Sequence, residues 1–224
     1  MSELVQFSLG ERLKPKGNIQ TVGIMGCGTV GQVITRIIAQ YGMDVIFLDL
    51  TEKRLKEIYH DIEDQLDGVI AQWGITSSEK KLIMSHIKGT TNYNDLRNCD
   101  LIIETISSRQ KGTLLSLRKE LFQKVEDVVS KNTIISSDLS TLIISDLAVV
   151  LKYPERAIGV HFIEPIDKTN IVEVVKGRQT SEETYDKISR FLRMINKRAI
   201  LINESPGNVS TRILIPLINE ACEI

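Results

Sequence analysis

Short apolar runs alternate with segments of helical periodicity along most of the chain, from about residue 19 to residue 203. Runs such as DVIFLDL and AIGVHF are short, apolar and rich in β-branched residues, which is typical of buried strands. Between such runs, apolar residues recur every three or four positions, which predicts amphipathic helices. This alternation predicts an α/β fold of the doubly wound Rossmann type, with a mostly parallel sheet and helices on both faces.

The chain divides into three predicted parts. Residues 1–18 mix charged and scattered apolar residues and are expected to form a polar N-terminal arm. Residues 19–205 carry the strand–helix alternation. Residues 206–224 begin with Pro206-Gly207 and continue as one helix that is apolar around most of its circumference. Such a helix needs a covering surface, so we expect either a homodimer or a fragment that holds only the first helix of a larger helical domain.

Two consecutive helices are predicted between residues 52 and 88. The first follows the apolar positions from Leu55 to Trp73 and ends at Gly74, and the second spans Ser78 to Ile87. We expect the two to fold back on each other as an antiparallel pair that protrudes from the main domain.

Composition excludes several classes of function. The net charge is −1, and the basic and acidic residues are spread along the chain without the basic patch that nucleic-acid binding requires. The three cysteines are far apart, which excludes a disulfide framework and offers no metal-ligand spacing. No apolar run approaches transmembrane length. We therefore expect a cytoplasmic protein without a metal, nucleic acid or membrane partner.

A glycine-rich turn joins the first predicted strand to the first predicted helix, with the sequence Gly26-Cys27-Gly28-Thr29-Val30-Gly31. In a dinucleotide-binding turn the first glycine permits the tight turn, the second lets the backbone approach a pyrophosphate, and the third allows close packing of helix on strand. The helix N-terminus then faces the phosphates with free N–H groups. A purely structural glycine turn is the alternative.

The end of the second predicted strand supports the dinucleotide interpretation. Asp49 lies 18 residues after Gly31, where a carboxylate would accept hydrogen bonds from the adenosine ribose. Because a carboxylate there repels a 2′-phosphate, the sequence favours NAD over NADP. The nearby Lys53 and Arg54 leave NADP open as an alternative.

An ionisable residue lies within each of two neighbouring apolar strands. His161 is near the end of AIGVHF, and Glu173 follows 12 residues later within IVEVV. A carboxylate between valines is costly to bury unless it is paired. We therefore expect Glu173 to pair with His161, whereas a lone structural histidine is the alternative.

Several motifs together resemble the L-3-hydroxyacyl-CoA dehydrogenase family: GCGTVG, Asp49, IIET, SDLSTL, IGVHFIEP, IVEVVKGRQTSEET and ESPG. The resemblance covers residues 19–224. It implies an NAD-dependent oxidoreductase that interconverts a 3-hydroxyacyl and a 3-oxoacyl thioester, carried on CoA or on an acyl carrier protein. It also implies that the helical pair at 52–88 is the family's protruding arm, near which the CoA portion binds.

The resemblance assigns roles to individual residues. His161 matches the general base, and Glu173 matches the carboxylate that orients the imidazole and stabilises the imidazolium ion. Ser140 matches the serine that hydrogen-bonds the reacting oxygen. Glu104 and Arg118 match the cofactor-binding set, Arg118 standing where the family's lysine would fall.

The chain departs from the family pattern where substrate is expected. Glu164 and Thr211 stand where the family has asparagines, and Ser107, Ser108 and Arg109 belong to an insertion of about five residues. Glu164 and Thr211 are therefore candidate substrate-pocket residues. These departures favour a short, polar acyl group, such as those that relatives in polyketide-type pathways oxidise on carrier proteins. They also leave open a protein that binds NAD but has lost or altered catalysis.

Overall fold

The computed structural model describes residues 18–106 and 114–223. Nearly all of the predicted N-terminal arm, together with Ser107, Ser108 and Arg109, lies outside these ranges.

The described residues form one eight-stranded sheet in the order β3-β2-β1-β4-β5-β6-β7-β8. The strands are β1 (Thr21–Met25), β2 (Asp44–Leu48), β3 (Ile87–Thr90), β4 (Leu101–Glu104), β5 (Ile134–Ser137), β6 (Ala157–Phe162), β7 (Ile171–Lys176) and β8 (Arg198–Asn203). Neighbouring strands pair in parallel except β6 and β7, which are antiparallel. The strand order reverses between β1 and β4, the switch point at which doubly wound sheets bind ligands.

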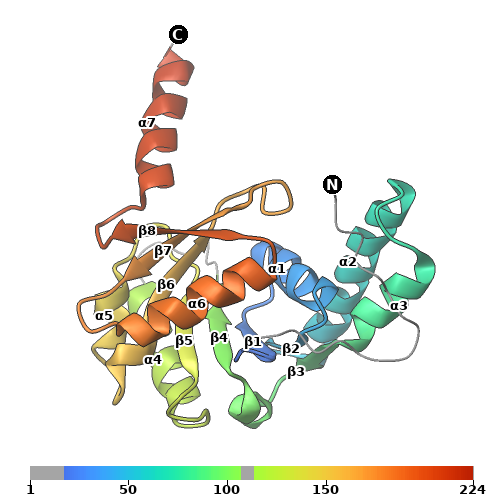
Figure 1. The fold of residues 1–224 in the computed structure, drawn as a ribbon, viewed down its shortest axis with the longest axis horizontal. Helices are drawn as coiled ribbons and strands as arrows, with labels where there is room; N and C mark the ends of the chain where they lie inside the picture. Colours follow the sequence, from blue (N-terminus) through green and yellow to red (C-terminus); the bar gives the residue numbers. More distant parts are fainter. Residues whose placement is uncertain (1–17, 107–113, 224) are drawn as a thin grey trace.

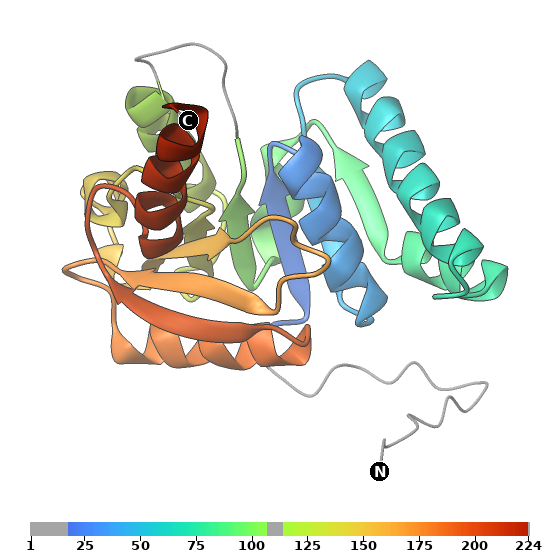
Figure 2. The same cartoon turned by 90° about the horizontal axis from the view of Figure 1, so that it is seen from above.

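Helices cover both faces of the sheet (Figure 1). They are α1 (Thr29–Gln40), α2 (Glu52–Ala71), α3 (Ser77–Ser85), η1 (Tyr93–Asn98), α4 (Leu114–Glu126), α5 (Ile144–Ala148), η2 (Pro154–Arg156), α6 (Glu182–Met194) and α7 (Val209–Glu223). Apolar side chains of α1, α2 and α6 form one core cluster, and those of α4 and α5 form a second. Figure 2 shows α1 and α2 side by side. Two cores with a sheet between them confirm the predicted Rossmann-type fold.

Strand β3 was not predicted, because the sequence Ile-Lys-Gly-Thr lacks an apolar run. The second helix of the pair therefore ends at Ser85, and residues 87 and 88 belong to the sheet rather than to the arm. Gly89 permits this pairing, since a Cβ there would lie 2.6 Å from Cζ of Phe47 on β2. The close approach of the Phe47 ring to the β3 backbone depends on a tertiary contact that strand propensity does not reveal.

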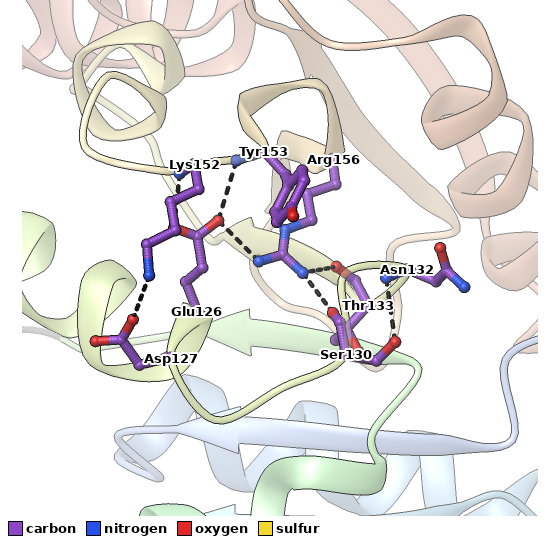
Figure 3. A network of polar contacts seen from close by, with 8 residues as sticks. All are labelled: Glu126, Asp127, Ser130, Asn132, Thr133, Lys152, Tyr153 and Arg156. Atoms are coloured by element: carbon purple, nitrogen blue, oxygen red, sulfur yellow. Dashed lines mark hydrogen bonds and ion pairs between the residues drawn. The ribbon is translucent and has the colours of Figure 1, made fainter.

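A buried ion pair holds α4 against the segment that leads into β6 (Figure 3). Arg156 Nη2 lies 2.8 Å from Glu126 Oε1, and both side chains are almost fully buried. The Glu126 carboxylate also accepts the backbone N–H groups of Lys152 and Tyr153, at 2.7 and 3.2 Å. Arg156 in turn donates to the carbonyl oxygen of Ser130. This network fixes the start of the strand that carries His161.

Helix α7 projects away from the rest of the molecule (Figure 1), and none of its residues is buried. Its position agrees with the predicted apolar helix after Pro206-Gly207. Within residues 18–106 and 114–223, no helix is both long and apolar enough to span a membrane.

Candidate active site

The glycine turn after β1 is shaped by two positions that exclude any larger residue. Gly26 has φ +79°, and a Cβ there would lie 2.3 Å from Cγ1 of Ile106. A Cβ on Gly31 would lie 2.6 Å from the Thr105 hydroxyl and 2.9 Å from the Gly26 carbonyl oxygen. The Thr105 hydroxyl donates to that carbonyl at 2.7 Å. The turn can therefore pack against Thr105 and Ile106, the two residues that follow β4, only because positions 26 and 31 are glycine.

The N-terminus of α1 is suited to an anion. Gly28 is its N-cap and supplies no side-chain cap, and the first turn carries no acidic residue. Cys27 is fully buried with its sulfur 3.6 Å from the Thr35 hydroxyl, and burial raises the pKa of the Cys27 thiol to about 12, so that it stays neutral. Thr29 is exposed and Val30 half-buried at the start of the helix. The first turn of α1 therefore places no acidic side chain of its own against the free backbone N–H groups and the positive end of the helix dipole.

Asp49 follows β2 at the same edge of the sheet and is half-buried. Its Oδ1 accepts the backbone N–H of Leu50 at 2.8 Å. The two basic residues nearby both form ion pairs with Glu57, Arg54 at 3.1 Å and Lys53 at 3.8 Å. Glu57 therefore offsets part of the positive charge of Lys53 and Arg54, while no ion pair of Asp49 is found among the described residues.

Glu104 and Arg118 form a buried pair beside the glycine turn. Arg118 Nη1 lies 3.2 Å from Glu104 Oε2, and the carboxylate also accepts the Ile106 N–H at 2.6 Å and the Ser137 hydroxyl. Burial raises the pKa of Glu104 in spite of these partners. Arg118 also donates to the Ile106 carbonyl at 2.6 Å, but its buried Nε has no partner among the described residues. The two predicted cofactor-binding residues thus contact each other.

His161 on β6 and Glu173 on β7 are direct partners in the antiparallel pairing. His161 Nδ1 lies 2.8 Å from Glu173 Oε2, with the two side chains 15% and 5% exposed. Burial works to raise the pKa of Glu173, but hydrogen bonds from His161 and Ser210 outweigh it and lower that pKa. Because an ionised carboxylate can only accept, Nδ1 carries the proton and Nε2 is left with a free lone pair.

Two residues of this site were missed by the sequence analysis. Ser210 donates twice to Glu173, from its N–H to Oε1 and from its hydroxyl to Oε2, both at 2.8 Å. Asp138 follows β5 and accepts the Phe162 N–H at 2.9 Å, and burial raises its pKa to about 6. A carboxylate directly after a buried strand was a usable signal for Asp138. No local pattern pointed to Ser210.

The remaining predicted residues are linked to this pair only through neighbouring residues. Ser140 follows β5, and its carbonyl oxygen accepts the Asn208 N–H at 2.9 Å. Glu164 is exposed just beyond β6, and its charge helps to raise the pKa of Asp138. Thr211 is half-buried in the first turn of α7.

The glycine turn follows the carboxyl end of β1, and His161 lies near the carboxyl end of β6, at the same end of the parallel strands. Backbone bonds run along this edge, from the Thr105 N–H to the Met25 carbonyl at 2.9 Å and from the Asp138 N–H to the Glu104 carbonyl at 2.8 Å. Strands β1, β4, β5 and β6 are consecutive neighbours, which separates turn and pair by about 14 Å. No group of metal-ligating side chains occurs among the described residues. The fold therefore places the glycine turn and the His161–Glu173 pair at the carboxyl ends of neighbouring strands.

Comparison with known proteins shows the family of this chain. Residues 21–205 match the family model described as 3-hydroxyacyl-CoA dehydrogenase, NAD binding domain. The chain belongs to the 3-hydroxyacyl-CoA dehydrogenase family. It is an NAD-dependent oxidoreductase, as the glycine turn and the resemblance predicted.

Individual relatives agree with this assignment. The 3-hydroxybutyryl-CoA dehydrogenase of Clostridioides difficile is 33% identical over 203 residues, which cover 91% of this chain and 70% of that protein. The 3-hydroxybutyryl-CoA dehydrogenase of Bradyrhizobium diazoefficiens is 30% identical over 203 residues, covering 91% and 68%. The crystal structure of (S)-3-hydroxybutyryl-CoA dehydrogenase from Ralstonia eutropha superposes with a TM-score of 0.84 at 33% identity, covering 91% and 70%.

Proposed function

We propose that this dehydrogenase interconverts a 3-hydroxyacyl and a 3-oxoacyl thioester, with His161 as the general base. The observation that carries the proposal is the contact of 2.8 Å between His161 Nδ1 and Glu173 Oε2, at the same sheet edge as the glycine turn. The relatives from Clostridioides difficile and Bradyrhizobium diazoefficiens support CoA as the carrier, since both are named 3-hydroxybutyryl-CoA dehydrogenase.

The chain's own residues account for the proton in this reaction. The free Nε2 of His161 accepts the proton of the substrate hydroxyl as the C–O bond becomes a carbonyl. Glu173 holds the imidazole by Nδ1 and stabilises the imidazolium ion that results. Ser140 hydrogen-bonds the reacting oxygen. NAD, when bound, accepts the hydride that leaves the carbinol carbon.

The turn and the end of β2 would hold the cofactor. The backbone of Gly26–Gly31 and the α1 N-terminus would bind the pyrophosphate, and Asp49 would accept hydrogen bonds from the adenosine ribose. Glu104 and Arg118 are buried beside the turn, and Arg118 Nε has no partner among the described residues. We expect this pair to support the nicotinamide end of the cofactor site from within the protein.

The test is formation of NADH by the purified protein with 3-hydroxybutyryl-CoA and NAD. We expect turnover by the wild type, loss of turnover in His161→Ala with NAD binding retained, and little change in His60→Ala, whose side chain is exposed on α2. NAD binding without turnover on a panel of 3-hydroxyacyl thioesters would instead favour a protein that has lost or altered catalysis.

We further propose that the acyl group is short and polar, carrying an amine or an additional hydroxyl. Two carboxylates, Asp138 and Glu164, lie close enough to interact with each other near His161, and Asp138 also interacts with the imidazole. Negative charge at this position favours a polar or cationic substituent over a fatty chain. Turnover of glyceryl- or seryl-acyl carrier protein, as used in polyketide-type pathways, should then exceed that of 3-hydroxybutyryl-CoA. A clear preference for the CoA ester would reject this proposal.

Helix α7 supports a homodimer. Six of its large apolar side chains are 46–62% exposed: Val209, Ile213, Leu214, Ile215, Leu217 and Ile218. Covering them with a second copy would bury this apolar surface. Light scattering after gel filtration should give the dimer mass, and a monomer at micromolar concentration would contradict it.

A further inference from the structure

Side chains of the segment between β8 and α7 bind this segment to α5 and to the loop after β5. The proposed reaction does not itself require these contacts. Glu204 accepts the N–H and the hydroxyl of Ser145 at the start of α5, both at 2.7 Å. Asn208, 4% exposed, donates from Nδ2 to the Leu139 carbonyl at 2.6 Å and from its N–H to the Ser140 carbonyl. The segment thereby holds the loop that carries Ser140.

Ser210 extends these contacts to Glu173, the partner of His161. Oε2 of Glu173 accepts from two donors at 2.8 Å, His161 Nδ1 and Ser210 Oγ, while Oε1 accepts the Ser210 N–H. The backbone bond needs no particular side chain, but the hydroxyl bond does. Ser210 therefore contacts the Glu173 carboxylate through an atom that an aliphatic side chain at this position would lack.

We propose that Ser210 is a positioning residue of the catalytic pair, whose hydroxyl fixes the Glu173 carboxylate in the orientation that faces His161 Nδ1. This inference rests on the proposed function, because it assigns Ser210 a role through His161. A carboxylate held by three donors cannot rotate without losing at least one of them. The hydrogen bond from the Ser210 hydroxyl also reduces the effective negative charge on Oε2. Glu173 then stabilises the imidazolium ion of His161 less strongly than it would without this bond.

The other charged groups near the pair come from different elements. Asp138, after β5, interacts with His161, and Glu164, after β6, interacts with Asp138. Arg118 on α4 also interacts with Asp138. Ser210, on α7, is uncharged and donates to Glu173. Replacing it therefore leaves the charges of Asp138, Glu164 and Arg118 unchanged.

The test compares Ser210→Ala, Ser210→Thr and Ser205→Ala in the full chain. Ser205 lies in the same segment, but its hydroxyl donates to the Gly207 carbonyl, away from the pair. In Ser210→Ala we expect kcat/KM to fall about three- to tenfold and the acidic limb of its pH profile to move to higher pH by about half a unit. Ser210→Thr should restore both, and Ser205→Ala should match the wild type.

A second readout uses the free protein. The side-chain ¹⁵N titration of His161 by NMR, with its signals assigned through His161→Gln, should shift upward in Ser210→Ala and return in Ser210→Thr. If His161→Ala abolishes turnover but Ser210→Ala moves neither the pH profile nor the titration, the positioning role is wrong. If His161→Ala remains active, the proposed function fails, and the NMR titration still decides whether Ser210 acts on the pair.

Discussion

His161 and Glu173 face each other across β6 and β7, the one antiparallel pair among the strands described, with Nδ1 2.8 Å from Oε2. In an antiparallel pair, directly opposite residues project to the same face of the sheet, so the contact is set by backbone register. A dyad built on two paired strands is more rigid than one carried on loops.

Replacing Glu173 with Gln tests the charge in this contact. The amide retains the size of the side chain but neither stabilises the imidazolium ion nor requires the proton on Nδ1. We expect kcat to fall by about two to three orders of magnitude with little change in the dissociation constant for NAD. Steady-state kinetics and NAD titration measure both. Glu182→Gln, on the exposed start of α6, is the control, and a Glu173→Gln enzyme of near wild-type kcat would contradict the role.

Asp138 should make stability depend on pH. Its pKa is raised by burial from 3.8 to about 6, so the folded protein holds this proton more tightly than the unfolded chain does. The free energy of unfolding therefore falls as pH rises through this range, and the penalty is fully present above about pH 6.

Asp138→Asn removes the charge and retains an acceptor for the Phe162 N–H. Its stability relative to wild type should be about 1 kcal/mol more favourable at about pH 8 than at about pH 4.5, a value reduced from the full shift because the side chain is partly exposed. Urea denaturation at both pH values measures this. A stability difference that is the same at both pH values would mean that folding does not raise the pKa of Asp138.

Asp49 should determine the choice of dinucleotide. In Asp49→Asn the repulsion of a 2′-phosphate is lost and the ribose hydrogen bonds weaken, so the dissociation constant for NAD should rise about tenfold while that for NADP falls. Fluorescence titration with each reduced dinucleotide gives the ratio. Asp64→Asn, exposed on α2, should leave it unchanged. An unaltered ratio in Asp49→Asn would place the ribose elsewhere.

The buried ion pair in Figure 3 should contribute strongly to stability once one partner is removed. In Glu126→Gln the Arg156 guanidinium stays buried without a counter-charge, which costs about 3 kcal/mol. The adjacent Asp127→Asn removes only an exposed partner of Lys152 and should change stability by less than about 1 kcal/mol. Urea denaturation of the two variants provides the comparison, and similar values for both would show that the Arg156 charge is solvated.

Local patterns predicted most of the elements because burial and backbone conformation leave a periodic trace in sequence. Strand β6 occupies Ala157–Phe162, the predicted run AIGVHF, and α1 follows directly on the predicted glycine turn. Strand β3 was not predicted because its pairing depends on the close packing of the Phe47 ring against the Gly89 backbone, and Phe47 lies 42 residues earlier in the chain. The insertion at residues 107–109 lies outside the described ranges and stays a prediction.

The amino-acid sequence by itself determined the α/β class, the glycine turn and the candidate pair of His161 and Glu173, because each depends on residue type and short-range spacing. Only the tertiary structure decided that β6 and β7 pair antiparallel in the register that joins these two side chains. It also brought Ser210 to Glu173 across 37 residues and joined Arg118 to Glu104 inside the protein. Such contacts depend on how parts of the chain that are distant in sequence pack together. The free energy of this packing leaves no local periodicity in the sequence.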